Sequence, residues 1–595
     1  MRPTKILGSA LLTLVCLSPA AGTDEFPEAD AILRALDKEM ARSMTLQLED
    51  FETPYQIQYT VTDNKTHRMT ASYGAIVTAN EGRARNFRSQ IRVGSYELDN
   101  SNVGGGGAIG RRGGGGFGRG GGGGGVGTAL PLDDDETALR KAIWLASDRD
   151  YKTAIELLSQ KKRLIQERGD DERPDDFARV EPVQHFEPRA DLKIDEKAWK
   201  DRLRHLSGKF LDHKHIVDSN VRLQAVDGRT YLVTSEGTRI VSGDTSVMLT
   251  IQASALTEEG ETVSDDLAYL AEFPGEMPSD AEILADIETM AGGLARAIAA
   301  PRLDDYLGPI LFDGEASPQL FQQLVARGAA AQPAAVGGGR RRRGGVQNLE
   351  RFMNRKILPT AFSVYDDPRV EKVGDTPLAG HYLFDAEGVE AQRVDLIEKG
   401  RVQDLLMTRT PTADRSGSNG HARGAGGRAA IGCLFVEMDG GLSSAELKEE
   451  LIEAARAQGL EYGIRVSSLE GGAGRNAQAA LRRAARGRGG FGGGRGGGGA
   501  GGGGLGDPVF VFKVYVEDGR EEPVRGAEFD SITLRDLGML TAAGAEPTVL
   551  NRLGAAPSSI IAPAVLLEEA ELIRAEAASV PKPILPAPHA REKEE

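Results

Sequence analysis

The spacing of apolar residues divides the first half of the chain into helical and extended stretches. Apolar positions three and four residues apart predict three helices, over residues 28–44, 136–167 and most of 195–217. Apolar and polar residues alternate through 55–97 and again through 220–257, which predicts a strand meander. Within the second stretch, Asp227-Gly228 is typical of a two-residue hairpin turn, because both residues tolerate positive φ.

The second half shows shorter alternating runs. They predict six strands, over residues 361–366, 393–398, 402–408, 431–438, 462–468 and 509–517. Two serines, Ser279 and Ser443, each stand three positions before a glutamate, which is the spacing of a capping box and predicts a helix start. The helix after Ser279 should extend to Ala299, and a further helix is predicted over 530–540.

A chain of 595 residues is long enough for two or three domains, each with its own core. Because strands and helices mix without regular βαβ alternation, the fold class is predicted to be α+β. We predict an N-terminal domain over residues 24–300, built as a strand meander with helices. The C-terminal domain is predicted over 301–575, as a mixed, partly barrel-like antiparallel sheet with helices, followed by a disordered tail over 576–595.

Four segments rich in glycine and arginine interrupt this pattern, over residues 103–127, 335–345, 415–428 and 484–506. They contain too few apolar residues to form a core, so we predict disordered or mobile insertions at loop tips. Their composition is similar to that of RNA-binding tails, with Phe117 and Phe491 available to stack on bases. The formal net charge of −16 repels phosphate backbones, so no nucleic-acid partner is expected.

The N-terminus has the composition of a signal peptide. Arg2 and Lys5 precede an apolar run over residues 6–17, and small residues follow at 18–22. Residues 1–22 are therefore predicted to direct export, which places the mature chain in the periplasm or outside the cell. Cys16 lies in the run and leaves a lipoprotein open, although Val15 stands where lipoprotein signals prefer a small residue. The run is shorter than the roughly 20 residues that span a bilayer, and no transmembrane span is expected in the mature chain.

Several segments of the second half, in the same order, resemble the TldD/PmbA metallopeptidase-like family. They are Asp304–Ala326, Pro377–Gly400, the Arg-Ser-Gly-Ser-Asn-Gly-His-Ala-Arg loop at 415–423, Lys513–Gly526 and Ile532–Leu537. The resemblance covers most of 301–570 and extends in element order over 25–300. It implies a role in proteolysis or peptide binding.

Active members of this family carry His-Glu-x-x-x-His on a helix, where two imidazoles bind zinc and the glutamate acts as general base. In this chain the histidine positions fall on Asp313 and Pro318 in one register, and on Gly314 and Gln319 in the other. Glu315 matches the glutamate in the second register. A cysteine completes the family's metal site, and residues 545–565, where it is expected, contain none. We therefore expect neither zinc nor another cofactor.

The family offers a precedent for this loss, because PmbA (TldE)-type subunits lack the metal motif and pair with TldD-type subunits. The resemblance implies a homodimer, or a heterodimer with a TldD-type subunit, that binds a peptide or an unfolded polypeptide. Two other interpretations stay open. One is a non-enzymatic envelope scaffold whose Gly/Arg-rich loops bind polyanions, and the other is a hydrolase whose carboxylates act without a metal.

Three residues are the candidate site. Asp313 and Glu315 would serve as general acid or base in a closed cleft, or would only cap a helix start. His421 would line the cleft, or would be a flexible surface histidine among low-complexity neighbours.

Two further features are interpreted as structural. His213 and His215, with Asp218 nearby, are two potential metal ligands, although a polar turn after a helix is the preferred interpretation. Cys433 lies in an apolar run and is predicted to be a buried core thiol.

Overall fold

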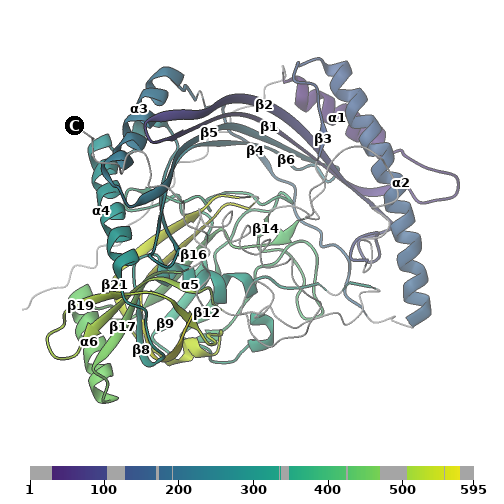
Figure 1. Cartoon of the computed structure of the whole chain (residues 1–595). Helices are drawn as coiled ribbons and strands as arrows, with labels where there is room; N and C mark the ends of the chain where they lie inside the picture. Colours follow the sequence, from purple (N-terminus) through teal and green to yellow (C-terminus); the bar gives the residue numbers. More distant parts are fainter. Residues whose placement is uncertain are drawn as a thin grey trace, which may run out of the picture.

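The computed structural model describes residues 30–103, 127–168, 173–190, 192–333, 335–336, 348–423, 427–469, 505–554 and 556–575. Within these ranges the chain is an α+β protein with two large sheets (Figure 1). The predicted signal peptide, the tail after 575 and most of the Gly/Arg-rich segments lie outside the described residues.

The first sheet has seven strands in the order β3-β2-β1-β5-β6-β4, with β7 also paired to β6. Its strands are β1 (Pro54–Ser72), β2 (Ala75–Val93), β3 (Thr128–Ala129), β4 (Gln184–Phe186), β5 (Ile216–Thr234), β6 (Arg239–Leu256) and β7 (Thr262–Ala271). All pairings are antiparallel except that of β4 with β6. In Figure 1 the long strands arch over the second half of the chain.

Helices cover the two ends of these long strands. They are α1 (Ala31–Ser43), α2 (Glu136–Arg168), α3 (Glu196–Gly208) and α4 (Asp280–Ala299), with 3₁₀ turns at Lys209–Asp212 and Pro274–Glu276. Apolar faces of α1 and α2 share one core with β1 and β2, whereas α3 and α4 share another with β5 and β6. Each long strand therefore packs against α1 and α2 near one end and against α3 and α4 near the other.

The second sheet has eleven strands in the order β13-β12-β9-β16-β22-β8-β17-β18-β19, with β20 and β21 also paired to β22. Its strands are β8 (Tyr306–Phe312), β9 (Phe362–Asp366), β12 (Val394–Glu398), β13 (Arg401–Val402), β16 (Cys433–Met438), β17 (Tyr462–Leu469), β18 (Pro508–Tyr515), β19 (Glu521–Val524), β20 (Ala527–Phe529), β21 (Leu540–Arg552) and β22 (Ser558–Arg574). Parallel and antiparallel pairs occur together. As far as the described strands extend, no sheet closes into a barrel, so the partly barrel-like prediction was wrong.

Two helices pack on opposite faces of this sheet. They are α5 (Ala316–Leu324) and α6 (Ser444–Ala457). Leu320 of α5 lies in one core with Ile464 and Val466, whereas Leu447 of α6 packs with Leu311 on the other face. The remaining elements are 3₁₀ turns at Ala326–Gly328, Leu349–Phe352 and Asp536–Met539, and two small ribbons, β10 (Lys372–Val373) with β11 (Thr376–Pro377) and β14 (Ala422–Arg423) with β15 (Arg428–Ala429).

The sequence predictions for regular elements are largely confirmed. Helices α1, α2 and α4 and five of the six strands predicted in the second half lie within two or three residues of the expected bounds. Both capping boxes form: Ser279 and Ser443 accept from the backbone three residues on, and the glutamates bond back. No helix in the described part of the chain is long and apolar enough to cross a membrane.

Three local predictions were wrong. Asp227 and Gly228 lie inside β5, where they pair with Thr245 and Asp244, and the strand turns only after Thr234. Glycine fits there because a Cβ would come 2.9 Å from the Asn64 Oδ1 atom. Residues 403–408 are irregular rather than extended. The helix expected over 530–540 is reduced to a 3₁₀ turn before β21.

Candidate functional site

The start of α5 is where the family resemblance places its metal motif, and it is closed by internal hydrogen bonds. Glu315 is the N-cap residue, and one turn later Gln319 donates from Nε2 to Glu315 Oε2 at 3.1 Å. The Gln319 Oε1 atom accepts from the Leu469 N–H of β17 at 2.6 Å. Since Gln319 is fully buried, both halves of its amide are committed to the protein itself.

The second candidate carboxylate, Asp313, contacts a different element. Its Oδ2 atom accepts from Arg465 Nη1 at 2.8 Å, and Oδ1 accepts from Ser467 Oγ at 2.7 Å. Ile464 and Val466 face α5, so the alternation of β17 puts Arg465 and Ser467 on the face that carries α6. Asp313 is therefore held on the opposite side of the sheet from the core of α5.

His421 lies in a third place and is fully buried. Its Nε2 atom is 3.1 Å from Asp366 Oδ1, and its Nδ1 atom is 2.9 Å from the Asn419 carbonyl oxygen. The backbone N–H of Gly432 also donates to Asp366. His421 is thus a packed residue, and the expectation of a flexible surface loop was wrong for 415–423. His421 and Asp313 share no bonding partner.

The donor set at α5 does not fit zinc. In one register Asp313 is ion-paired to Arg465 and Pro318 has no donor atom; in the other Gly314 has no side chain and the Gln319 amide is already bonded. The described residues contain no group of three or more histidine, cysteine, aspartate or glutamate side chains placed to hold a metal ion.

The histidine pair and Cys433, which the sequence analysis interpreted as structural, can now be placed. His213 follows the 3₁₀ turn after α3, with Nε2 3.3 Å from Glu288 Oε2, while His215 Nε2 lies 2.9 Å from the Ala291 carbonyl. Their ring centroids are 5.8 Å apart and lie against different residues of α4, which agrees with a polar turn. Cys433 is a fully buried free thiol, as predicted, and burial raises its pKa.

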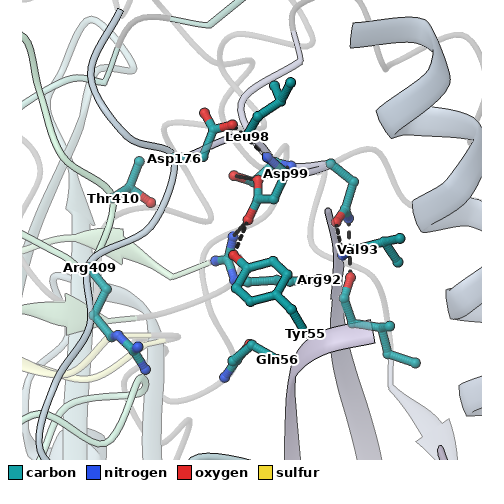
Figure 2. Close-up of polar contacts among 12 residues, drawn as sticks. Tyr55, Gln56, Arg92, Val93, Leu98, Asp99, Asp176, Arg409 and Thr410 are labelled. Carbon is teal, nitrogen blue, oxygen red and sulfur yellow. Dashed lines mark hydrogen bonds and ion pairs between the residues drawn. The ribbon is translucent and has the colours of Figure 1, made fainter. Parts of the chain in front are cut away.

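A hydrogen-bonded polar cluster lies between the two sheets, and sequence reasoning did not find it. Arg409 is fully buried and pairs through both terminal nitrogens with Glu236, at 2.7 and 2.6 Å, while it also donates to the Ala178 carbonyl. Arg92 and Tyr55 each donate to Asp99 Oδ2 at 2.8 Å, and Figure 2 shows the two side chains converging on this carboxylate. We call these five residues, with Ala178, the junction network.

An aromatic ring joins the two ion pairs of the junction network. The guanidinium carbons of Arg92 and Arg409 lie 3.6 and 3.9 Å from the centroid of the Phe177 ring. Such cation–π contacts stabilise desolvated arginines. Arg92 comes from the first sheet and Arg409 from the second half, so the ring links the two parts of the molecule.

A turn next to the junction network carries two more buried carboxyls. Asp385 accepts from the backbone N–H groups of Glu387, Val389 and Ala422, each at 2.9 Å. Glu387 accepts from the backbone N–H of Arg409 at 2.7 Å. Burial raises the pKa of Asp385 to about 6, and burial together with the charge of Asp385 raises the pKa of Glu387 to about 7.

The carboxyls of the junction network behave in the opposite way. Burial alone would raise the pKa of Asp99 and of Glu236, but Arg92 and Arg409 hold both below their usual values. For the junction network and the adjacent turn together, the only sequence signal was the Phe-Asp-Ala-Glu-Gly run at 384–388. This run drew attention by its family resemblance and not by its chemistry. Nothing in its local sequence marked Arg409.

Comparisons with known proteins place this architecture. Residues 301–487 match the family described as PmbA/TldA metallopeptidase C-terminal domain. No curated protein sequence matches the chain.

Three solved structures share the fold over almost their whole length. A candidate modulator of DNA gyrase from Thermotoga maritima is 14% identical with a TM-score of 0.56, over 91% of this chain and 99% of that one. TldE from Thermococcus kodakarensis is 12% identical with a TM-score of 0.54, over 91% and 100%. A candidate modulator of DNA gyrase from Bacteroides thetaiotaomicron is 12% identical with a TM-score of 0.52, over 90% and 98%. At these identities the likeness concerns the fold alone.

Proposed function

Because the chain belongs to the PmbA/TldD metallopeptidase family, we propose that it is an exported, peptide-binding member without a zinc site of its own, acting as one subunit of a dimer. The observation that carries this proposal is the state of Gln319. In the register that aligns Glu315 with the family's glutamate, this chain has, where an active member needs an imidazole, an amide whose two ends bond to Glu315 and Leu469. A zinc ion there would find no free donor on α5.

Metal analysis of the purified full chain tests the metal-free part of the proposal. After incubation with zinc and removal of excess ion, we expect far less than one equivalent bound. The matched control is Gln319→Ala, which removes the amide without adding a ligand and should bind equally little. One tightly bound zinc per chain in the unmodified protein, lost in this variant, would contradict the proposal.

Peptide binding and partner choice need the protein in its native setting. A pull-down from the envelope fraction should recover either a second copy or a relative with His-Glu-x-x-x-His, and fluorescence polarisation should detect binding of an extended peptide. The mass of the recovered chain also tests export, since removal of residues 1–22 is expected. Recovery of the uncleaved chain from the cytosol alone would remove the export claim.

A metal-independent hydrolase would behave differently in the same assay. Cleavage of the peptide by the chain alone, unaffected by a chelator and lost in Glu315→Gln, would assign the chemistry to the carboxylates. We expect binding without cleavage, because Glu315 is bonded to Gln319 and Asp313 contacts Arg465 on the other face of the sheet.

A further inference from the structure

The turn over Asp385–Gly388 connects the second half of the chain to the first sheet. The Ala386 carbonyl accepts from Gln58 Nε2 of β1 at 2.7 Å. Gly388 has φ +77° and lies so close to the first sheet that a Cβ there would be 2.9 Å from Thr238 Cγ2. The turn is therefore a docking element, held against the sheet by contacts at the residues on either side of Glu387.

Those two carboxyls are buried without a cation of their own. Asp385 is 5% exposed and Glu387 is 3% exposed, and neither forms an ion pair with any described residue. Both carboxyls accept hydrogen bonds from backbone N–H groups. Neutral donors offset only part of the free energy of burying a charge, and two carboxylates within one turn also repel each other. The arrangement favours retention of a proton.

We propose that the Asp385–Gly388 turn is a proton-dependent latch between the two sheets. It is closed while the Asp385–Glu387 pair holds at least one proton, and it loosens when both carboxyls are ionised. This inference does not depend on the proposed function, since it rests on the junction between the sheets and not on α5.

The groups that face the pair come from every element packed around it: Arg92 of β2, Glu236 between β5 and β6, Tyr382 before the turn, Arg409 after β13, and His421 with its partner Asp366 of β9. Arg92 and Arg409 are already paired with Asp99 and Glu236, so their positive charges are largely offset. His421 bonds to Asp366 rather than to the pair.

The direction of the pH effect follows from raised pKa values. The pKa of Asp385 is about 6 and that of Glu387 about 7, whereas both are near 4 in an unfolded chain. A group whose pKa is raised on folding contributes stability that is fully present below the unfolded value. That contribution is lost as the pH rises through the folded value. The latch should therefore loosen between about pH 6 and pH 8.

The test compares the full chain at pH 5.5 and pH 8.5. At the higher pH we expect Tm to fall by roughly 2–6 °C, and hydrogen-exchange protection to fall selectively at the amides of Glu387, Val389, Arg409 and Ala422. In Glu387→Gln, and in Asp385→Asn as a second variant, both differences should shrink by at least half. The control Asp395→Asn alters an exposed ion pair with Arg393 and should keep the full pH response.

Two results would overturn the latch. One is a pH response of Tm and protection that is unchanged in both neutral variants, because the pair would then not be its source. The other is protection at these four amides that stays constant from pH 5.5 to 8.5 in the unmodified chain. Should either variant fail to fold, the protection measurement on the unmodified chain still decides the question.

Discussion

Two pairs of carboxyls lie side by side at the junction between the sheets, all buried except the half-buried Glu236, and they differ in their partners. Asp99 and Glu236 each bond to an arginine, and their pKa values are lowered despite burial. Asp385 and Glu387 bond to backbone N–H groups, and their pKa values are raised. Burial alone therefore does not decide the charge of a group; the charge of its donor does. One pair should act as a permanent connection and the other as a titratable one.

The largest effect should come from removing the cation of the permanent pair. Arg409→Met leaves Glu236 without its guanidinium and opens the stack on Phe177. Breaking a buried ion pair from one side costs about 3–5 kcal/mol, because the remaining charge keeps only neutral donors, which for Glu236 are the Tyr96 hydroxyl and the Gln56 amide. We expect urea-induced unfolding at pH 7 to show a loss of that size.

A double variant separates the lost pair from the lost volume. Arg409→Met with Glu236→Gln removes the unpaired charge, so it should recover a large share of the loss. If the double variant is as unstable as Arg409→Met alone, the cost lies in packing around Phe177, and the contrast between the two carboxyl pairs loses its main support.

Asp99→Asn should remove a pH response that is opposite in sign to the one expected for the latch. The pKa of Asp99 is lowered, so its contribution to stability is present above the unfolded value of about 3.9 and disappears as the pH falls below it. The variant should lose about 2–3 kcal/mol at pH 7, since Arg92 keeps only a neutral acceptor. Thermal unfolding from pH 3 to pH 7 should show a weaker dependence than in the unmodified chain. An unchanged acid dependence would assign it to other carboxyls.

The contrast between these pairs also shows what the sequence could and could not predict. Helix α4 and its capping box were predictable because every signal lies within four residues. Asp227-Gly228 carried an equally strong turn signal, but pairing with β6 along the whole of β5 overrode it. Local propensity is decisive only where no long-range pairing competes with it.

The candidate site shows the same limit. Asp313 and Glu315 were correctly placed near a helix start. However, Asp313 bonds to Arg465 of β17, and no local pattern shows this contact. Arg409 and Glu236 are 173 positions apart, and His421 is 55 positions from Asp366. Such partners become neighbours only through the sheet topology, so a single sequence could not reveal them.

Removal of Gln319, a neutral buried side chain, should cause a loss of stability of intermediate size. Gln319→Ala deletes the acceptor of the Leu469 N–H and the donor to Glu315. Leaving one buried N–H without an acceptor costs about 1–2 kcal/mol, and no ionised pair is broken. The loss measured by urea unfolding should be the same at pH 5.5 and pH 8.5. A loss that varies with pH would show that Glu315 titrates in this range and is more than a structural acceptor.

The smallest effect should come from the same ion-pair chemistry at the surface. Lys162 on α2 lies 2.6 Å from Glu52, and both side chains are 45% exposed. Water and salt screen this pair, and its geometry must be held against the mobility of two long side chains, so Lys162→Ala should cost no more than about 0.5 kcal/mol. Raising the salt concentration should reduce even that difference, whereas the loss in Arg409→Met should persist because a desolvated pair is screened far less. A surface pair that contributed as much as the Arg409 pair would show that partner charge, rather than partner charge combined with burial, sets the strength of the junction.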